Sequence, residues 1–175
     1  AGGARALMQS IEGAEDDPEA GRRAIRFRGV EKKDVVIGIA ASGRTPFVWG
    51  ALEEAAKHGA RTALICFNPN TRRRAGVPKL ILAPAIGPEV LTGSTRLKAG
   101  TATKLILNCI TTLAMVRLGK VCGNLMVDLD PKNKKLRDRA VRIVQTLTGT
   151  KAADARGALE RSGWMVKAAV GNLKH

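Results

Sequence analysis

Residues 35–67 read VVIGIAASGRTPFVWGALEEAAKHGARTALICF and contain the clearest pattern of strands and helices in the chain. Its first residues form a nearly continuous apolar run, which predicts a buried strand over residues 34–40. A helix is expected to begin at Pro46 after an N-cap at Thr45, because apolar residues follow at helical spacing until a glycine ends the run. Residues 62–67 and 79–83 are predicted to be two further strands. This order predicts an α/β fold with a parallel sheet and covering helices.

The second part of the chain is predicted to be helical. Apolar residues cover most of the circumference of a helix over residues 97–118, so we expect this helix to be heavily buried. After residue 130 a charged amphipathic helix over 133–146 and two short helices within 148–174 are predicted. The chain is therefore expected to have an α/β domain over residues 1–130 and a small helical domain over residues 131–175.

The charge of the chain is strongly positive. Thirty Lys and Arg residues stand against 15 Asp and Glu residues, a net charge of +15, and Glu89 is the single acid between residues 55 and 127. Such a charge attracts phosphorylated molecules or nucleic acids. A nucleic-acid partner is disfavoured, because the chain has no Tyr, three Phe and two Trp and lacks a recognition motif. Trp49 and Trp164 are expected to be packing residues, and the basic run 72–74 is assigned no role.

Several other classes find little support in the composition. Three scattered cysteines and two histidines form neither a zinc pattern nor a disulfide framework, so no metal site is expected. No stretch reaches the roughly 18 uninterrupted apolar residues of a membrane span, and no secretory signal is visible. We therefore expect no membrane partner.

The loop between the first strand and its helix is a candidate anion site. Ligands of parallel sheets bind at the carboxyl ends of the strands, where loops lead into helix N-termini. The Ser42 and Thr45 hydroxyls, the flexible Gly43 backbone and the Arg44 charge all suit a phosphate group. The alternative is that Thr45 only caps the helix and that Ser42 and Gly43 only turn the chain.

Two further polar segments stand out. TGSTRLKAGTATK, residues 92–104, places hydroxyl, glycine and basic residues at the start of the long helix, which favours a second anion or sugar contact. IEGAEDDPEAG, residues 11–21, concentrates acids in a basic chain. A solvated helix start is the ordinary explanation of such acids, and a carboxylate that acts as a general base is the functional one.

Taken together, GAEDD, IAASGRTPFV, EVLTGSTRLKAGTATKLILN and GKVCGNLMVDL resemble the N-acetylmuramic acid 6-phosphate etherases. These belong to the sugar isomerase (SIS) superfamily and are related to the glucokinase regulatory protein. The resemblance implies a doubly wound parallel sheet with a small C-terminal helical unit, a cytoplasmic homodimer and no cofactor. It also implies a lyase that cleaves the D-lactyl ether of N-acetylmuramic acid 6-phosphate by elimination and then water addition.

The resemblance assigns roles to residues that match its motifs. Glu15 is the proton-abstracting base, and the residues that contact the phosphorylated amino sugar are Ser42, Gly43, Arg44, Thr45, Glu89, Ser94, Arg96 and Lys98. Family members normally begin earlier, with a second phosphate loop and a glutamate that acts as general acid. The chain is therefore expected to be a fragment, truncated at both ends and inactive alone. A phosphosugar-binding regulatory module without chemistry is the alternative function.

Overall fold

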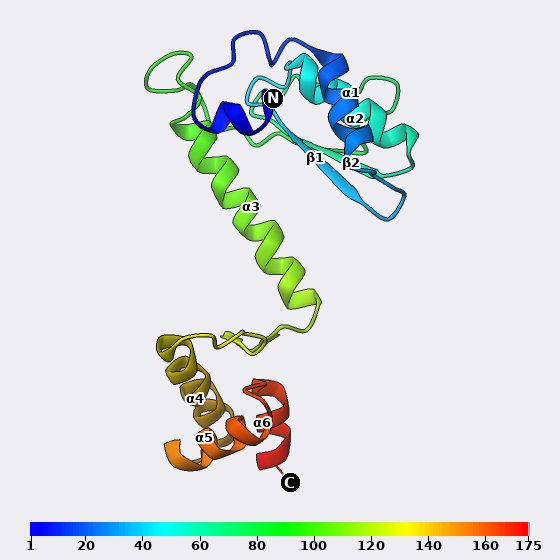
Figure 1. Cartoon of the computed structure of the whole chain (residues 1–175). Coiled ribbons are helices and arrows are strands. Elements are labelled where there is room, and N and C mark those ends of the chain that lie inside the picture. Colours follow the sequence, from blue (N-terminus) through cyan, green and yellow to red (C-terminus); the bar gives the residue numbers. More distant parts are fainter. Residues whose placement is uncertain (175) are drawn as a thin grey trace. The chain divides into compact units, whose positions relative to one another are not determined.

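A computed structural model describes residues 1–174 of the chain (Figure 1). The contacts divide it into two compact units, Ala1–Ile106 and a second that begins at Leu107. The expected domain border after residue 130 lies within the second unit and stays a prediction. The elements in chain order are η1 (Gly3–Leu7), α1 (Pro18–Phe27), β1 (Val35–Ile39), α2 (Pro46–Lys57), β2 (Arg61–Ile65), β3 (Leu80–Leu82), α3 (Lys98–Arg117), β4 (Val121–Cys122), β5 (Leu125–Met126), α4 (Lys134–Thr148), α5 (Ala152–Arg161) and α6 (Val166–Leu173).

The first unit is built on a parallel sheet with the strand order β1-β2-β3. Val35 of β1 pairs with Arg61, and Ala63 of β2 pairs with Leu80. In the central strand β2 every residue except Arg61 is buried. The expected α/β class is confirmed: a parallel sheet is flanked by helices and is followed by a helical unit.

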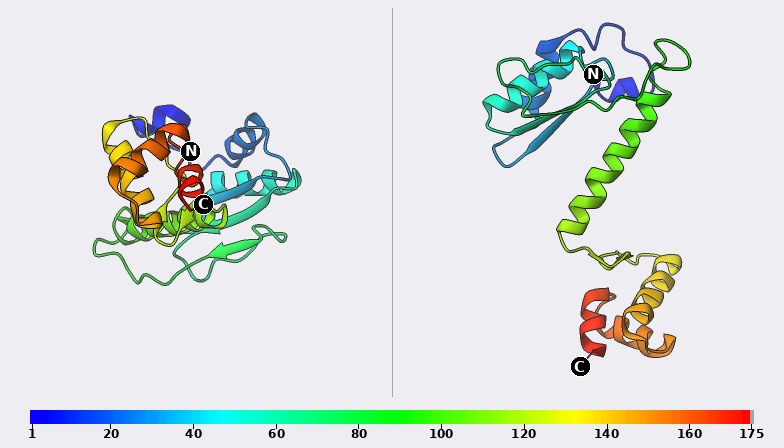
Figure 2. Two further views of the ribbon diagram at one scale, coloured as in Figure 1. Left: turned by 90° about the horizontal axis from the view of Figure 1, so that it is seen from below. Right: turned by 180° about the vertical axis from the view of Figure 1, so that it is seen from behind.

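Helices α1 and α2 lie on the same side of this sheet (Figures 1 and 2). Helix α2 packs on β1 at Gly38, where a Cβ atom would stand 2.6 Å from Val48. Helix α1 crosses α2 at two glycines: a Cβ atom on Gly21 would stand 2.1 Å from the Phe47 carbonyl oxygen, and one on Gly50 would stand 2.0 Å from that of Pro18. Only glycine therefore allows this close approach of the two helices.

Two ion pairs join the same helices. Arg22 of α1 binds Glu53 of α2 at 2.8 Å, and Arg26 binds Glu54 at 3.1 Å. The hydrogen bond from Arg26 lowers the pKa of the Glu54 carboxyl below its ordinary value. The Glu54 side chain is almost fully buried, and it also lies near Lys57 and His58.

Three helices, α4, α5 and α6, surround the core of the second unit. Helix α4 begins at Asn133, whose side chain accepts a hydrogen bond from the Leu136 N–H, and it ends at Gly149 with a φ of 73°. The core consists mainly of small and branched apolar residues: Ala140, Val141, Ile143, Val144, Ala155, Ala158, Leu159, Val166 and Ala169.

The long helix α3 differs from expectation. It forms where the sequence predicts it, but Ala99 is its single buried residue, and Leu113 is 62% exposed. The prediction of a heavily buried helix is wrong, because no element within residues 1–174 covers its apolar side chains. By length and composition alone, α3 is also apolar enough to cross a membrane, with a mean hydropathy of 1.3.

Candidate phosphosugar site

The carbonyl groups of the loop between β1 and α2 accept hydrogen bonds from other groups of the protein. Each of four successive carbonyl oxygens accepts one hydrogen bond: Ala40 from the Gly43 N–H at 2.8 Å, Ala41 from the Phe67 N–H at 2.9 Å, Ser42 from Asn68 Nδ2 at 3.3 Å and Gly43 from Trp49 Nε1 at 2.9 Å. These bonds fix the direction of every peptide group from Ala40 to Gly43.

Several amide N–H groups of the same loop are free to donate hydrogen bonds to a ligand. Within residues 1–174, the N–H groups of Ala41, Ser42 and Thr45 have no acceptor, whereas the Arg44 N–H donates to Ser42 Oγ at 3.2 Å. The free groups lie at or before the N-terminus of α2, where the helix dipole favours negative charge. The loop therefore offers an anion both backbone donors and a favourable dipole.

Thr45 and Gly43 have separate structural roles in the loop. Thr45 occupies the N-cap position of α2 as predicted, but its side chain makes no capping hydrogen bond. Its hydroxyl is thus free for another partner, which argues against the capping-only alternative. Gly43 has a φ of 70°, and a Cβ atom there would stand 2.3 Å from Thr71 Oγ1. No other residue fits at this position without displacing Thr71.

Glu15 is held beside this loop by its backbone. Its carbonyl oxygen accepts a hydrogen bond from the Phe47 N–H, in the first turn of α2, at 3.0 Å. Its exposed side chain lines a cavity of about 270 Å³ together with Ser42, Thr45 and Thr95. The structure therefore brings the acidic segment, the first loop and the second polar segment to one place.

The other acids of the segment 11–21 have partners of their own. Glu12 accepts a hydrogen bond from Ser10, and Glu19 binds Arg22 and Arg26. Asp17 caps α1 by accepting the Ala20 N–H at 2.9 Å, which lowers the pKa of its carboxyl. Asp16 does not line the cavity. Glu15 is thus the acid of this segment that faces the candidate site.

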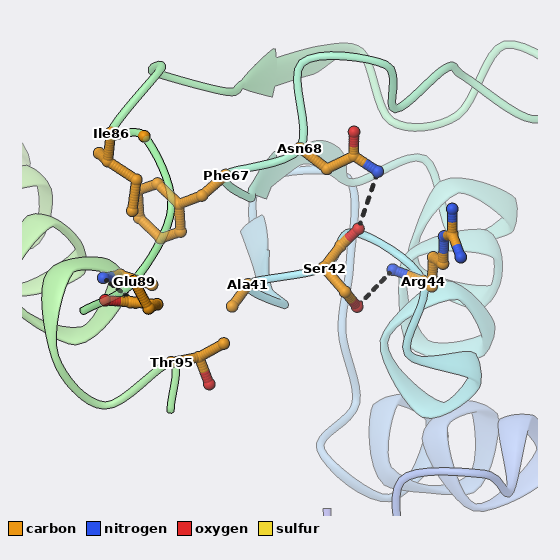
Figure 3. A pocket seen from close by; sticks show the side chains of 10 residues that line it. Ala41, Ser42, Arg44, Phe67, Asn68, Ile86, Glu89 and Thr95 are labelled. Atoms are coloured by element: carbon orange, nitrogen blue, oxygen red, sulfur yellow. Dashed lines mark hydrogen bonds between the residues drawn. The ribbon is translucent and has the colours of Figure 1, made fainter. Parts of the chain in front are cut away.

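A second cavity of about 280 Å³ adjoins the first (Figure 3). Ser42, Ala41 and Thr95 line both cavities, and the second also includes Phe67, Asn68 and Glu89. Arg44 lines it as well, but Figure 3 shows its side chain directed away from Thr95 and Glu89. The two cavities share Ala41, Ser42 and Thr95, and together they make up the candidate site, with Glu15 lining one cavity and Glu89 the other.

Glu89 and Lys98 are occupied by structural contacts. The two carboxylate oxygens of Glu89 accept the N–H groups of Lys98 at 2.8 Å and Ala99 at 3.0 Å, so Glu89 caps the N-terminus of α3. Lys98 Nζ donates to the Pro88 carbonyl oxygen at 2.8 Å. Ser94 is half-buried and Arg96 is exposed, and neither lines the two cavities. These four residues lie around the site, and their contact with a sugar remains a prediction.

Two residues of the site were not predicted. Thr95 lines both cavities, and Asn68 holds the Ser42 carbonyl group. Thr95 belongs to the hydroxyl-rich segment 92–104, and Asn68 follows the strand β2, so each carried a signal in the sequence. No group of three or more His, Cys, Asp or Glu residues is placed to hold a metal ion in the described part of the chain.

Two family models match separate parts of the chain. A family model of the glucokinase regulatory protein N-terminal SIS domain matches residues 1–56. A second model, the C-terminal lid domain of glucokinase regulatory protein, matches residues 123–174. Each match lies mainly in one of the two compact units.

Curated relatives cover nearly all of the chain. Proteins named N-acetylmuramic acid 6-phosphate etherase are 55% identical in Rhizobium rhizogenes and 52% identical in Mesorhizobium japonicum, each over 97% of this chain and 55% of the relative. The protein of that name in Clostridium acetobutylicum is 50% identical over 99% of this chain and 57% of its own length. The chain thus spans about half the length of the curated relatives it matches. Over nearly its whole length the chain is therefore similar to proteins named N-acetylmuramic acid 6-phosphate etherase.

Proposed function

We propose that the protein that contains this chain is a carbon–oxygen lyase. Its reaction releases D-lactate and N-acetylglucosamine 6-phosphate from N-acetylmuramic acid 6-phosphate. The proposal rests on the similarity of the chain to these etherases and on one observation in the site: the Ser42–Thr45 loop presents unpaired amide groups at a helix N-terminus beside the carboxylate of Glu15.

The loop is the proposed phosphate-binding part of the site. The amide groups of Ala41, Ser42 and Thr45 donate to the phosphate oxygens, and the hydroxyls of Ser42 and Thr45 add further donors. Such a contact depends on fixed directions of the N–H groups, and the four bonded carbonyl groups supply them. Thr95 is proposed to contact the sugar, because it lines both cavities.

Glu15 is proposed to act as the general base. Its carboxylate takes the proton from C2 of the ring-opened sugar, and the electron pair of the broken C–H bond is delocalised onto the C1 aldehyde oxygen as an enolate. This electron pair then forms the double bond between C2 and C3 as the C3–O bond breaks, and lactate leaves with a proton from a general acid. Water adds its hydroxyl group to C3 and a proton to C2, which gives the product. A base of this kind typically contributes 10²–10⁴-fold to the rate.

We further propose that the protein is a cytoplasmic homodimer. The support is the long apolar helix α3, whose exposed side chains include Leu105, Leu113, Met115 and Val116. An apolar surface of this kind on a folded protein marks an interaction site. The second copy would cover apolar side chains of α3 that are exposed in the described residues 1–174.

The second candidate function is a phosphosugar-binding module without chemistry. It is favoured by the family models, both of which describe domains of glucokinase regulatory protein. Such a module would use the Ser42 loop in the same way but would need no base. Glu15 therefore discriminates between the two functions.

The test follows solvent deuterium at C2 of N-acetylglucosamine 6-phosphate by NMR. We expect exchange with the full-length protein that contains these residues and a loss of at least 100-fold in its Glu15→Gln variant, with binding of the sugar phosphate retained. The matched control is Asp16→Asn, whose carboxylate does not line the cavity and should leave exchange unchanged. Binding without exchange in the native protein would instead favour the regulatory module, and equal exchange in Glu15→Gln would remove Glu15 from the mechanism.

A further inference from the structure

Trp49 links the candidate phosphate loop to a segment that the proposed function does not use. The indole Nε1 donates to the Gly43 carbonyl oxygen at 2.9 Å, and Trp49 is only 2% exposed. The guanidinium carbon of Arg74 lies 4.1 Å from the centre of the Trp49 ring, within the range of a cation–π contact. Arg74 belongs to the basic run 72–74, to which the sequence assigned no role.

The chain after β2 contacts the loop at two more points. Asn68 Nδ2 donates to the Ser42 carbonyl oxygen, and Thr71 packs directly on Gly43, where a Cβ atom would stand 2.3 Å from Thr71 Oγ1. Arg74 is itself fixed by reciprocal backbone hydrogen bonds with Val77 at 2.8 and 2.9 Å. We call Trp49, Asn68, Thr71 and Arg74 the Trp49 cluster.

We infer that Trp49 is a positioning residue for the phosphate loop, and that Arg74 acts through it. This inference rests on the proposed function, because the loop must bind a phosphate for its position to matter. Gly43 has no Cβ atom, so its own side chain does not restrict its backbone, and other contacts must fix the neighbouring peptide groups. The bond from Trp49 to the Gly43 carbonyl group fixes the peptide between Gly43 and Arg44, and with it the direction of the amide groups that follow.

The cation–π contact has a second consequence. Arg74 covers the Trp49 ring from one side, so the indole is held between the protein core and a guanidinium group. The positive charge also stands near the loop and adds to the attraction of an anion. Arg74 therefore contributes both by orienting Trp49 and by charge, and substitution by Lys should preserve only part of this.

The test compares Trp49→Phe with Trp164→Phe, the matched change of the other tryptophan, which lies in the second unit. N-acetylglucosamine 6-phosphate is titrated into each protein by calorimetry. An ordinary hydrogen bond corresponds to a change of about fivefold to tenfold in a binding constant, so Trp49→Phe should weaken binding by this factor. Trp164→Phe should bind as the native protein does, and Arg74→Lys should bind more tightly than Arg74→Met.

Amide hydrogen exchange is a second readout that needs no ligand. We expect faster exchange at Arg44 and Thr45 in Trp49→Phe and in Arg74→Met, with unchanged exchange in the strand β2. Failure of the native protein to bind the sugar phosphate would contradict the proposed function, while exchange at the loop still decides the role of Trp49. The inference would be overturned if both Trp49→Phe and Arg74→Met bound the sugar phosphate as tightly as the native protein and showed the same amide hydrogen exchange. If Trp49→Phe does not fold, the Arg74→Met variant alone tests the inference, because Arg74 is exposed and its replacement should leave the fold intact.

Discussion

Gly50 of α2 lies so close to Pro18, the first residue of α1, that a Cβ atom on Gly50 would stand 2.0 Å from the Pro18 carbonyl oxygen. Three residues before Pro18, the Glu15 carbonyl oxygen accepts the Phe47 N–H of the same helix α2. The position of the proposed base therefore depends on a close contact between two helix backbones.

Substitution of this glycine should destabilise the first unit. A methyl group in Gly50→Ala forces α1 away from α2, and overpacking of this kind costs about 1–3 kcal/mol of unfolding free energy. Urea unfolding followed by tryptophan fluorescence measures the change, with Trp49 reporting on the first unit and Trp164 on the second. The control is Gly171→Ala in α6, where a Cβ atom meets nothing within 4 Å and helix propensity predicts a gain of about 0.5–1 kcal/mol. An equally stable Gly50→Ala protein would contradict the close contact.

Two threonines, the buried Thr62 and the half-buried Thr71, should respond in opposite ways to replacement by valine. Thr71 Oγ1 is buried without a hydrogen-bond partner, so Thr71→Val removes an unsatisfied group and should raise the unfolding free energy by about 1 kcal/mol. Thr62 Oγ1 accepts the Lys79 N–H at 3.2 Å, so Thr62→Val should lower it by about 1 kcal/mol. Both values come from denaturant unfolding. A loss of stability in Thr71→Val would indicate that its hydroxyl has a partner.

The stability of the first unit should fall in acid. Arg26 holds the pKa of Glu54 below its ordinary value of 4.5 in the folded protein, so the unfolded chain binds a proton at this residue more readily. Stability is therefore fully present above about pH 4.5 and is lost as the pH falls toward the lowered pKa. Thermal unfolding between pH 3 and pH 7 should show a shallower decline below about pH 4.5 for Glu54→Gln than for the native protein. The control Glu160→Gln, in the second unit, should keep the native profile; identical profiles for all three proteins would remove Glu54 as a cause.

The exposed helix α3 should mediate self-association. Burial of one leucine side chain is worth about 1.5–3 kcal/mol, so Leu113→Lys should weaken the dimer at least tenfold. Thr112→Lys places the same charge on the adjacent exposed position and should have a smaller effect. Sedimentation velocity over a range of concentrations gives the masses. A native protein that stays monomeric but binds to lipid vesicles would contradict the dimer and favour a membrane contact of α3.

Much of the first unit could be predicted from local sequence patterns. The strand at residues 34–40 and the helix from Pro46 appear within a few residues of the predicted bounds, because the apolar periodicity and the proline act locally. The burial of α3 could not be predicted in the same way. Apolar residues around the whole circumference indicate that a helix packs against other elements, but they do not show which part of which chain packs against it.

Side-chain roles at the site were harder to predict than its location. The family resemblance implies a sugar contact for Glu89, and the sequence did not indicate that both of its oxygens also cap α3 through the N–H groups of Lys98 and Ala99. This cap depends on the turn between residues 89 and 98, and no sequence period specifies that turn. Asn68 was missed for a similar reason, because its hydrogen bond joins residues 26 positions apart.

Binding of a phosphate by the Ser42–Thr45 loop can be measured by an NMR titration of the amide groups with N-acetylglucosamine 6-phosphate. We expect saturable shifts of the Ala41, Ser42, Thr45 and Thr95 resonances, and no such shifts with N-acetylglucosamine, which lacks the phosphate. Saturable shifts confined to the basic run 72–74 or to the helices α4–α6, with the loop resonances unchanged, would contradict it.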